Sequence, residues 1–174
     1  YGLPEKIGGW EKVTSDALVG ATRAILSYSD LNGVKYIIYG TNKKLYAYSE
    51  GSYADITPTR STGTGNITQF ATTDGSSTVT VTDSSHGALI GDFVTIASVS
   101  GAVGGISAAN LQGEFEILTV PNANTYTIEA KAAASSTTTG STANATYQLN
   151  TGAAVSLFGY GWGAGTWSTS TWNT

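Results

Sequence analysis

Residues 78–96, TVTVTDSSHGALIGDFVTI, decide the fold class of this chain. Valine occupies every second position of TVTVT, so Val79 and Val81 fall on one face of an extended segment. GDFVTI returns as a second strand, and the residues between the two are small, polar or glycine. A period of two on both sides of a turn predicts an all-β fold.

The turn holds the chain's single histidine, His86, close to serine and aspartate, which are the ingredients of a hydrolase triad. A triad is a spatial arrangement, however, and the G-x-S-x-G nucleophile motif is missing. One histidine and no cysteine also leave a zinc site short of ligands. We therefore predict a structural turn, in which Asp83 and Ser84 bond the local backbone and His86 adopts an unusual φ. The turn residues are His86, Gly87, Gly91 and Asp92.

N-terminal to this stretch, residues 21–58 predict a β-meander of four short strands. The strand segments ATRAILSYS, VKYIIYG, LYAYS and YADITP are separated by DLNG, TNKK and EGS. Asn32-Gly33 supplies a positive φ for the first turn, and Asn42 is expected to take the left-handed conformation in the second. Four short strands with tight turns match one propeller blade or one sheet of a sandwich.

Residues 59–73 are rich in Thr, Ser and Gly and read as a linker. A second β-unit follows at residues 74–147, with a glycine-rich excursion near residue 104 and strands in EFEILTV, TYTIEA and TYQLN. Glu114 and Glu116 alternate with Phe115 and Ile117, so both carboxylates lie on one face. That face suits a glycosidase pair or a calcium site, but a solvated face opposite buried Phe115 and Ile117 is the simpler interpretation.

The tail FGYGWGAGTWSTSTW differs from the rest because its tryptophans recur every five residues. An odd spacing places successive side chains of a strand on opposite faces, so one sheet face cannot bury all three. We expect contact with a neighbouring subunit or domain, with core packing and sugar stacking as alternatives. The residues concerned are Tyr160, Trp162, Trp167 and Trp172.

Composition excludes several classes of function. Only 11% of residues are charged and the net charge is −4, so no basic surface for nucleic acid is present. Absent cysteine excludes disulfides and thiolate chemistry, and we predict neither a cofactor nor a metal. The chain shows no membrane span and no targeting segment. Methionine is absent even at position 1, so we expect a fragment, a processed product or part of a longer subunit.

The central segment resembles the FCCH domain, a small β-barrel-like domain of ubiquitin-activating enzymes that also recurs in bacteriophage tail proteins. The shared pattern is "HGxxxGDxVxI", then "LNGxFxV", then an "NTYTI" strand. His86-Gly87 and Gly91-Asp92 match the turn, and residues 124–127 match the last strand. Gln112 stands where the pattern has Asn, and AVGGISAAN is a longer insertion than it expects. The resemblance assigns His86 no catalytic role.

The flanking segments YGLPEKIGGWEKV, YGTNKKLYAYSEGSYADITP and GYGWGAGTWSTSTW resemble parts of the nozzle or tubular tail proteins of short-tailed phages. The resemblance implies an all-β chain in which a propeller-type meander carries an inserted FCCH-like barrel. Its parts would be the meander at 1–60, a linker at 61–73, the FCCH-like domain at 74–147, and a Gly/Trp-rich return segment to the first sheet at 148–174.

The resemblance also implies a function without chemistry. The chain would be a structural subunit of the virion tail, in a ring with copies of itself and beside adaptor or fibre proteins. DNA would meet it only by passing through the lumen. The alternative is an outward-facing binding module for tail fibres or host-surface glycans. An enzyme such as a depolymerase would need convergent carboxylates, and Glu114 and Glu116 are the only near pair.

Overall fold

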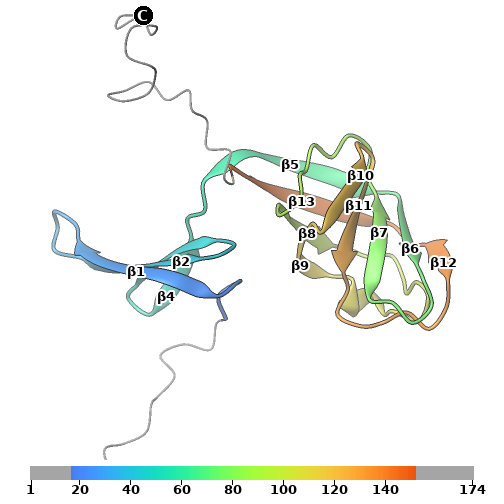
Figure 1. The fold of residues 1–174 in the computed structure, drawn as a ribbon, viewed down its shortest axis with the longest axis horizontal. Coiled ribbons are helices and arrows are strands. Elements are labelled where there is room, and N and C mark those ends of the chain that lie inside the picture. Colours follow the sequence, from blue (N-terminus) through green and yellow to red (C-terminus); the bar gives the residue numbers. More distant parts are fainter. Residues whose placement is uncertain (1–16, 152–174) are drawn as a thin grey trace, which may run out of the picture. The chain divides into compact units, whose positions relative to one another are not determined.

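The computed structural model describes residues 17–151, and the chain divides into two compact units after Thr57 (Figure 1). Over the described residues the fold is all-β, in agreement with the sequence. Its strands form three antiparallel sheets, none of which is closed. The helical content of this part is one 3₁₀ turn, η1 (Ala108–Asn110).

The first unit is one four-stranded meander with the order β1-β2-β3-β4, as the sequence predicts. The strands are β1 (Thr22–Ser29), β2 (Lys35–Thr41), β3 (Leu45–Ser49) and β4 (Ser52–Asp55).

The first two turns of the meander are held by side chains. The Asp30 carboxylate accepts hydrogen bonds from the backbone N–H groups of Asn32 and Val34, and Gly33 supplies the expected positive φ of 83°. The prediction that Asn42 is left-handed is wrong. The Thr41 hydroxyl closes that turn by accepting from the backbone N–H of Lys44 at 2.8 Å, so no positive φ is required.

The second unit, which begins at Pro58, contains two sheets. One has the order β10-β11-β7-β6-β12 and the other β5-β13-β8-β9. The strands of the first are β6 (Gln69–Thr72), β7 (Thr78–Thr82), β10 (Thr119–Asn122), β11 (Thr125–Glu129) and β12 (Thr138–Gly140). Those of the second are β5 (Thr59–Ile67), β8 (Phe93–Ala97), β9 (Gly113–Glu116) and β13 (Ala143–Asn150).

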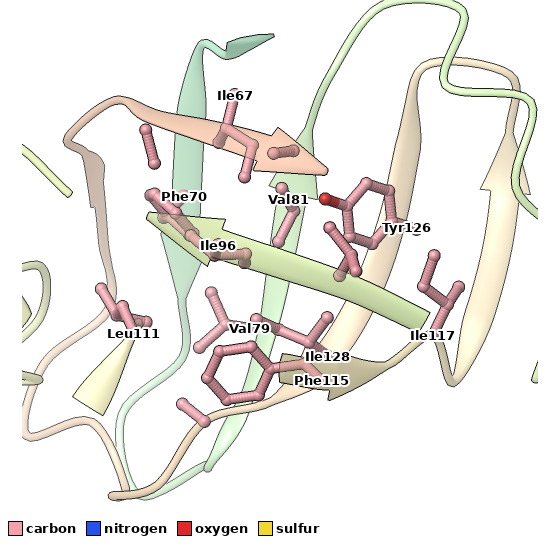
Figure 2. Packing of buried hydrophobic residues seen from close by; sticks show 14 of the residues in the cluster. Ile67, Phe70, Val79, Val81, Ile96, Leu111, Phe115, Ile117, Tyr126 and Ile128 are labelled. Carbon is pink, nitrogen blue, oxygen red and sulfur yellow. The ribbon is translucent and has the colours of Figure 1, made fainter. Parts of the chain in front are cut away.

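The core of the second unit lies between these two sheets (Figure 2). Val79 and Val81 from β7 are fully buried, which confirms that they share an inward face. They pack in one cluster with Val94 and Ile96 from the opposite sheet. The glycine-rich excursion also contributes buried side chains, Val103, Ile106 and Leu111, so it fills the core.

The predicted linker is wrong, because residues 61–73 form most of β5 and β6 (Figure 1). β5 pairs with β13 along its length, from Thr59 opposite Asn150 to Ile67 opposite Ala143. The chain passes from one sheet to the other between β5 and β6. It passes back between β12 and β13, which pair with β6 and β5 respectively. These pairs bind the 59–73 segment firmly into the second unit.

Candidate functional site

The His86 turn joins β7 to β8, and the imidazole is buried within it. Nδ1 accepts the backbone N–H of Ala88 at 3.1 Å, so the ring carries its proton on Nε2, which lies 3.3 Å from the carbonyl oxygen of Asn122. The ring packs edge-on against Tyr126, with centroids 5.0 Å apart. Both ring nitrogens are thus engaged with backbone groups, which is the geometry of a structural histidine.

The backbone of this turn differs from the sequence prediction in two details. His86 does not take a positive φ; its neighbours Ser85 and Gly87 do, at 55° and 64°. Asp83 does not bond the local backbone through its carboxylate, which instead accepts from the Tyr147 hydroxyl on β13. The turn is shaped by its neighbours in space as well as by its own sequence.

Asp92 is the most highly bonded group of the turn. Its Oδ2 accepts from Arg60 at 2.6 Å and from the backbone N–H of Leu89 at 2.7 Å. Its Oδ1 accepts from Arg60 at 2.9 Å and from the backbone N–H of Asn150 at 2.8 Å. The carboxylate is buried while Arg60 is about a third exposed, so the pair forms a bidentate ion pair at the edge of the core.

Arg60 connects Asp92 to β5 and β13, the first and last described strands of the second unit. Its guanidinium also donates to the carbonyl oxygens of Asn150, at 2.6 Å, and Gly87, at 3.1 Å. Arg60 lies at the start of β5, and Asn150 is the last residue of β13. We call this arrangement the Arg60–Asp92 clamp. It joins β5, β13 and the His86 turn through one carboxylate.

A second buried polar group lies inside the sandwich. The Tyr147 hydroxyl donates to Asp83 at 2.6 Å and lies 3.1 Å from the Tyr126 hydroxyl. Burial raises the pKa of both phenols, and for Tyr147 the nearby Tyr126 and Asp83 raise it further. Both hydroxyls therefore stay protonated, and that of Tyr147 is the donor to the Asp83 carboxylate. Gly65 leaves the space for this group, since a Cβ there would lie 1.9 Å from Asp83 Oδ2.

The structure places Glu114 and Glu116 on one face of β9, as predicted. Glu114 is exposed and Glu116 half-buried, whereas Phe115 and Ile117 are in the core. Nowhere between residues 17 and 151 do three histidine, aspartate or glutamate side chains gather as metal ligands would. The arrangement is that of a polar face opposite a buried one.

The sheet of the first unit has two apolar faces, which sequence reasoning did not identify. Residues directly opposite in antiparallel strands share a face. One face carries the row Leu26, Ile38, Ala47 and Ala54, and the other the rows Ile25-Tyr39-Tyr46 and Ile37-Tyr48-Tyr53. The consecutive apolar run YIIY in β2 is the signal that could have revealed this, because it leaves neither face polar.

Within residues 17–57 no second sheet packs on either face, although most residues of β2 and β3 are half-buried. Every residue of β1 is exposed, including Ile25 at 65% and Leu26 at 64%. Tyr46 is the one apolar side chain of this range that is buried, and no residue of the range belongs to the apolar core cluster. Large apolar side chains on both sides of one sheet are typical of a layer that packs between two others.

The predicted contact residues Tyr160, Trp162, Trp167 and Trp172 lie outside the described residues, as does most of the return segment. In the part that the structure describes, no helix has the length and apolar character to span a membrane.

Comparisons with known proteins place the chain in no family. No family model matches it, and neither does any curated protein. Among solved structures it is similar to a phage phi92 endosialidase, with 24% sequence identity and a TM-score of 0.42. The match covers 67% of this chain and 16% of the endosialidase, so the chain spans a small part of that protein's length.

Proposed function

We propose that this chain is a structural part of a bacteriophage tail, a nozzle or tubular ring subunit without chemistry of its own. The resemblance of its flanking and central segments to such tail proteins motivates the proposal. In this account residues 17–57 are a propeller-type blade, and the unit from Pro58 to Thr151 is an FCCH-like domain whose ends meet at the Arg60–Asp92 clamp. The Gly/Trp-rich tail, with Trp162, Trp167 and Trp172, contacts a neighbouring subunit.

The observation that carries the proposal is the sheet with two uncovered apolar faces. Burying apolar surface stabilises a protein by roughly 25 cal/mol per Å², and a single sheet layer forgoes most of that gain. In a propeller, each face of a blade packs on a neighbouring blade, so both apolar faces of such a sheet are buried. A part of a larger ring is therefore favoured over an independent binding module or enzyme.

The polar groups that could have served catalysis are used for structure instead. His86 bonds two backbone groups, and Asp92 accepts four hydrogen bonds. Asp83 is buried against Tyr147. A hydrolytic site needs a nucleophile within reach of a base that is free to take its proton. These engaged groups support the non-enzymatic proposal.

The proposal is tested by disturbing each face of the sheet in the particle that contains this chain. Ile25→Ser and Leu26→Ser alter opposite faces of β1, and Leu31→Ser changes a fully exposed residue of the adjacent turn as a matched control. We expect both face variants to reduce ring assembly, measured by mass photometry, and the control to assemble normally. Normal assembly of both face variants would refute the proposal. Glycan-array binding by an unassembled chain would favour the outward-facing binding module.

A further inference from the structure

The first strand of the second unit forms a long sheet edge. β5 is the terminal strand of the order β5-β13-β8-β9, and among residues 17–151 β13 is the one strand that pairs with it (Figure 1). In an antiparallel pair, alternate residues direct their N–H and C=O groups to opposite sides of the strand. About half of the backbone groups of β5 therefore face away from β13, along an edge where residues 59–62, 64 and 66 are exposed.

This edge lacks the features with which proteins usually prevent unwanted strand pairing. Edge strands are commonly short, or they carry charged residues or proline. The other edge strands of the second unit follow that rule: β9 and β10 have four residues each, β12 has three, β9 carries two glutamates and β10 contains Pro121. β5 has nine residues, no lysine and no proline, and its one register shift lies at the Arg60 end. Among the described residues, 61–67 therefore form a regular edge on which a further strand can pair.

The side chains of β5 indicate which strand fits this edge. Gly63 lies opposite the buried Tyr147, so the odd-numbered residues of β5 are on the core face and the even-numbered ones, including Thr62 and Thr64, are on the outer face. The sequence STGTG at 61–65 is nearly symmetric about its central glycine. A second copy of β5, turned about a two-fold axis through Gly63, would therefore place small residues opposite small ones and threonine opposite threonine.

We propose that two copies of this chain pair antiparallel through β5, with Gly63 of one copy opposite Gly63 of the other. Thr62 of each copy then faces Thr64 of the other on the outer face, and threonine pairs of this kind stabilise neighbouring strands. The two four-stranded sheets become one eight-stranded sheet. Its two-fold axis is the commonest symmetry among protein oligomers.

Charge and space along the edge also favour a second copy. Arg60 is the one charged residue of β5, and its charge is balanced by Asp92. In the proposed register Arg60 faces Asn66 of the other copy, so no like charges stand opposite each other. Nothing lies within 4 Å of a Cβ built on Gly63, so the two backbones approach without a side-chain clash. This contact goes beyond the ring proposed above and does not depend on it, because it uses an edge of the second unit.

The first test introduces charge at both outer-face threonines of the full 174-residue chain. Thr62→Lys with Thr64→Lys brings like charges opposite each other across the two-fold axis, and so does the matching pair of glutamate substitutions. We expect the native chain to pair as its concentration rises, measured by sedimentation velocity. Each charged variant alone should lose this pairing, and an equimolar mixture of the two should regain it. Thr78→Lys with Thr139→Lys adds the same charge at exposed positions of the other sheet and should pair like the native chain.

Several results would overturn the proposal. These are a native chain that shows no pairing at any concentration, a lysine variant that pairs like the native chain, and a mixture of the lysine and glutamate variants that does not pair. Slow hydrogen exchange of the β5 edge amides in a chain that does not pair would show that another part of the same chain covers the edge. Ile25→Ser and Leu26→Ser, which test the ring, should leave the β5 contact intact, so the two proposals fail independently.

A cross-link tests the register. The chain has no native cysteine, so Gly63→Cys carries a single thiol, which in the proposed pair lies opposite its own copy. Asn66→Cys is the control in the same strand, because its two thiols would be separated by six residues, or roughly 20 Å, along the strand direction. We expect a short bis-maleimide to link Gly63→Cys into a dimer and to leave Asn66→Cys mostly unlinked. Equal linking at the two positions, or none at position 63, would contradict the proposal.

Discussion

Removing the Asp92 carboxylate should severely destabilise the second unit. Asp92→Ala deletes both hydrogen bonds to Arg60 and leaves the backbone N–H groups of Leu89 and Asn150 without their acceptor. Removing one partner of a buried ion pair typically costs about 3–5 kcal/mol. A domain of this size has a total stability of roughly 5–15 kcal/mol, so the loss is a large fraction of what holds it folded.

The magnitude can be measured by urea unfolding, with circular dichroism as the signal. Asp74→Asn is the control, because Asp74 is exposed in a turn, and such surface changes usually fall within about 0.5 kcal/mol. Arg60→Ala should also be clearly destabilising, because it leaves the buried Asp92 carboxylate without its cation, although both N–H groups keep their acceptor. A loss below about 1 kcal/mol for Asp92→Ala would refute the view that the clamp stabilises the unit.

Three further predictions concern the buried group around Tyr147. Gly65→Ala should destabilise the unit by about 1–3 kcal/mol through overpacking, whereas Gly63→Ala in the same strand meets nothing within 4 Å and should not; equal thermal midpoints would contradict this. Tyr147→Phe leaves the buried Asp83 carboxylate without its donor and should cost about 1–3 kcal/mol in urea unfolding, and a neutral effect would count against that hydrogen bond. Because burial raises the folded-state pKa of Tyr126 and Tyr147, their contribution is complete below the unfolded value of about 10 and is lost as pH rises above it. Stability measured from neutral to strongly alkaline pH should therefore fall more steeply in the native chain than in Tyr126→Phe, and parallel curves would contradict the assignment.

The strands with strict alternation were predictable from the sequence. The alternation in TVTVT predicted a buried face at Val79 and Val81, and the DLNG turn predicted the positive φ at Gly33. The structural interpretation of His86 also followed from local features, since one histidine without a nucleophile motif has little chemistry available. These features depend on residues that are close together in the sequence, so the sequence alone is enough to predict them.

The clamp could not be predicted in this way. Arg60 lies 32 residues from Asp92, and nothing in their spacing connects them. Arg60 also belongs to β5, whose residues are mostly exposed and whose Thr, Ser and Gly content resembles a linker. Such a strand is recognised by its pairing with β13, whose residues lie 76 (Ile67 to Ala143) to 91 (Thr59 to Asn150) positions further along the chain. The uncovered faces of the first sheet likewise depend on which apolar residues remain unpacked after folding.

If this chain belongs to a ring, the mass of the particle that contains it will show a fixed number of copies. Native mass spectrometry of that particle should give one discrete assembly, which we expect to hold roughly six to twelve subunits, because a closed cyclic ring has a fixed copy number. A monomer at all concentrations would contradict the account. The two apolar faces of the first sheet would then need a partner other than a neighbouring subunit.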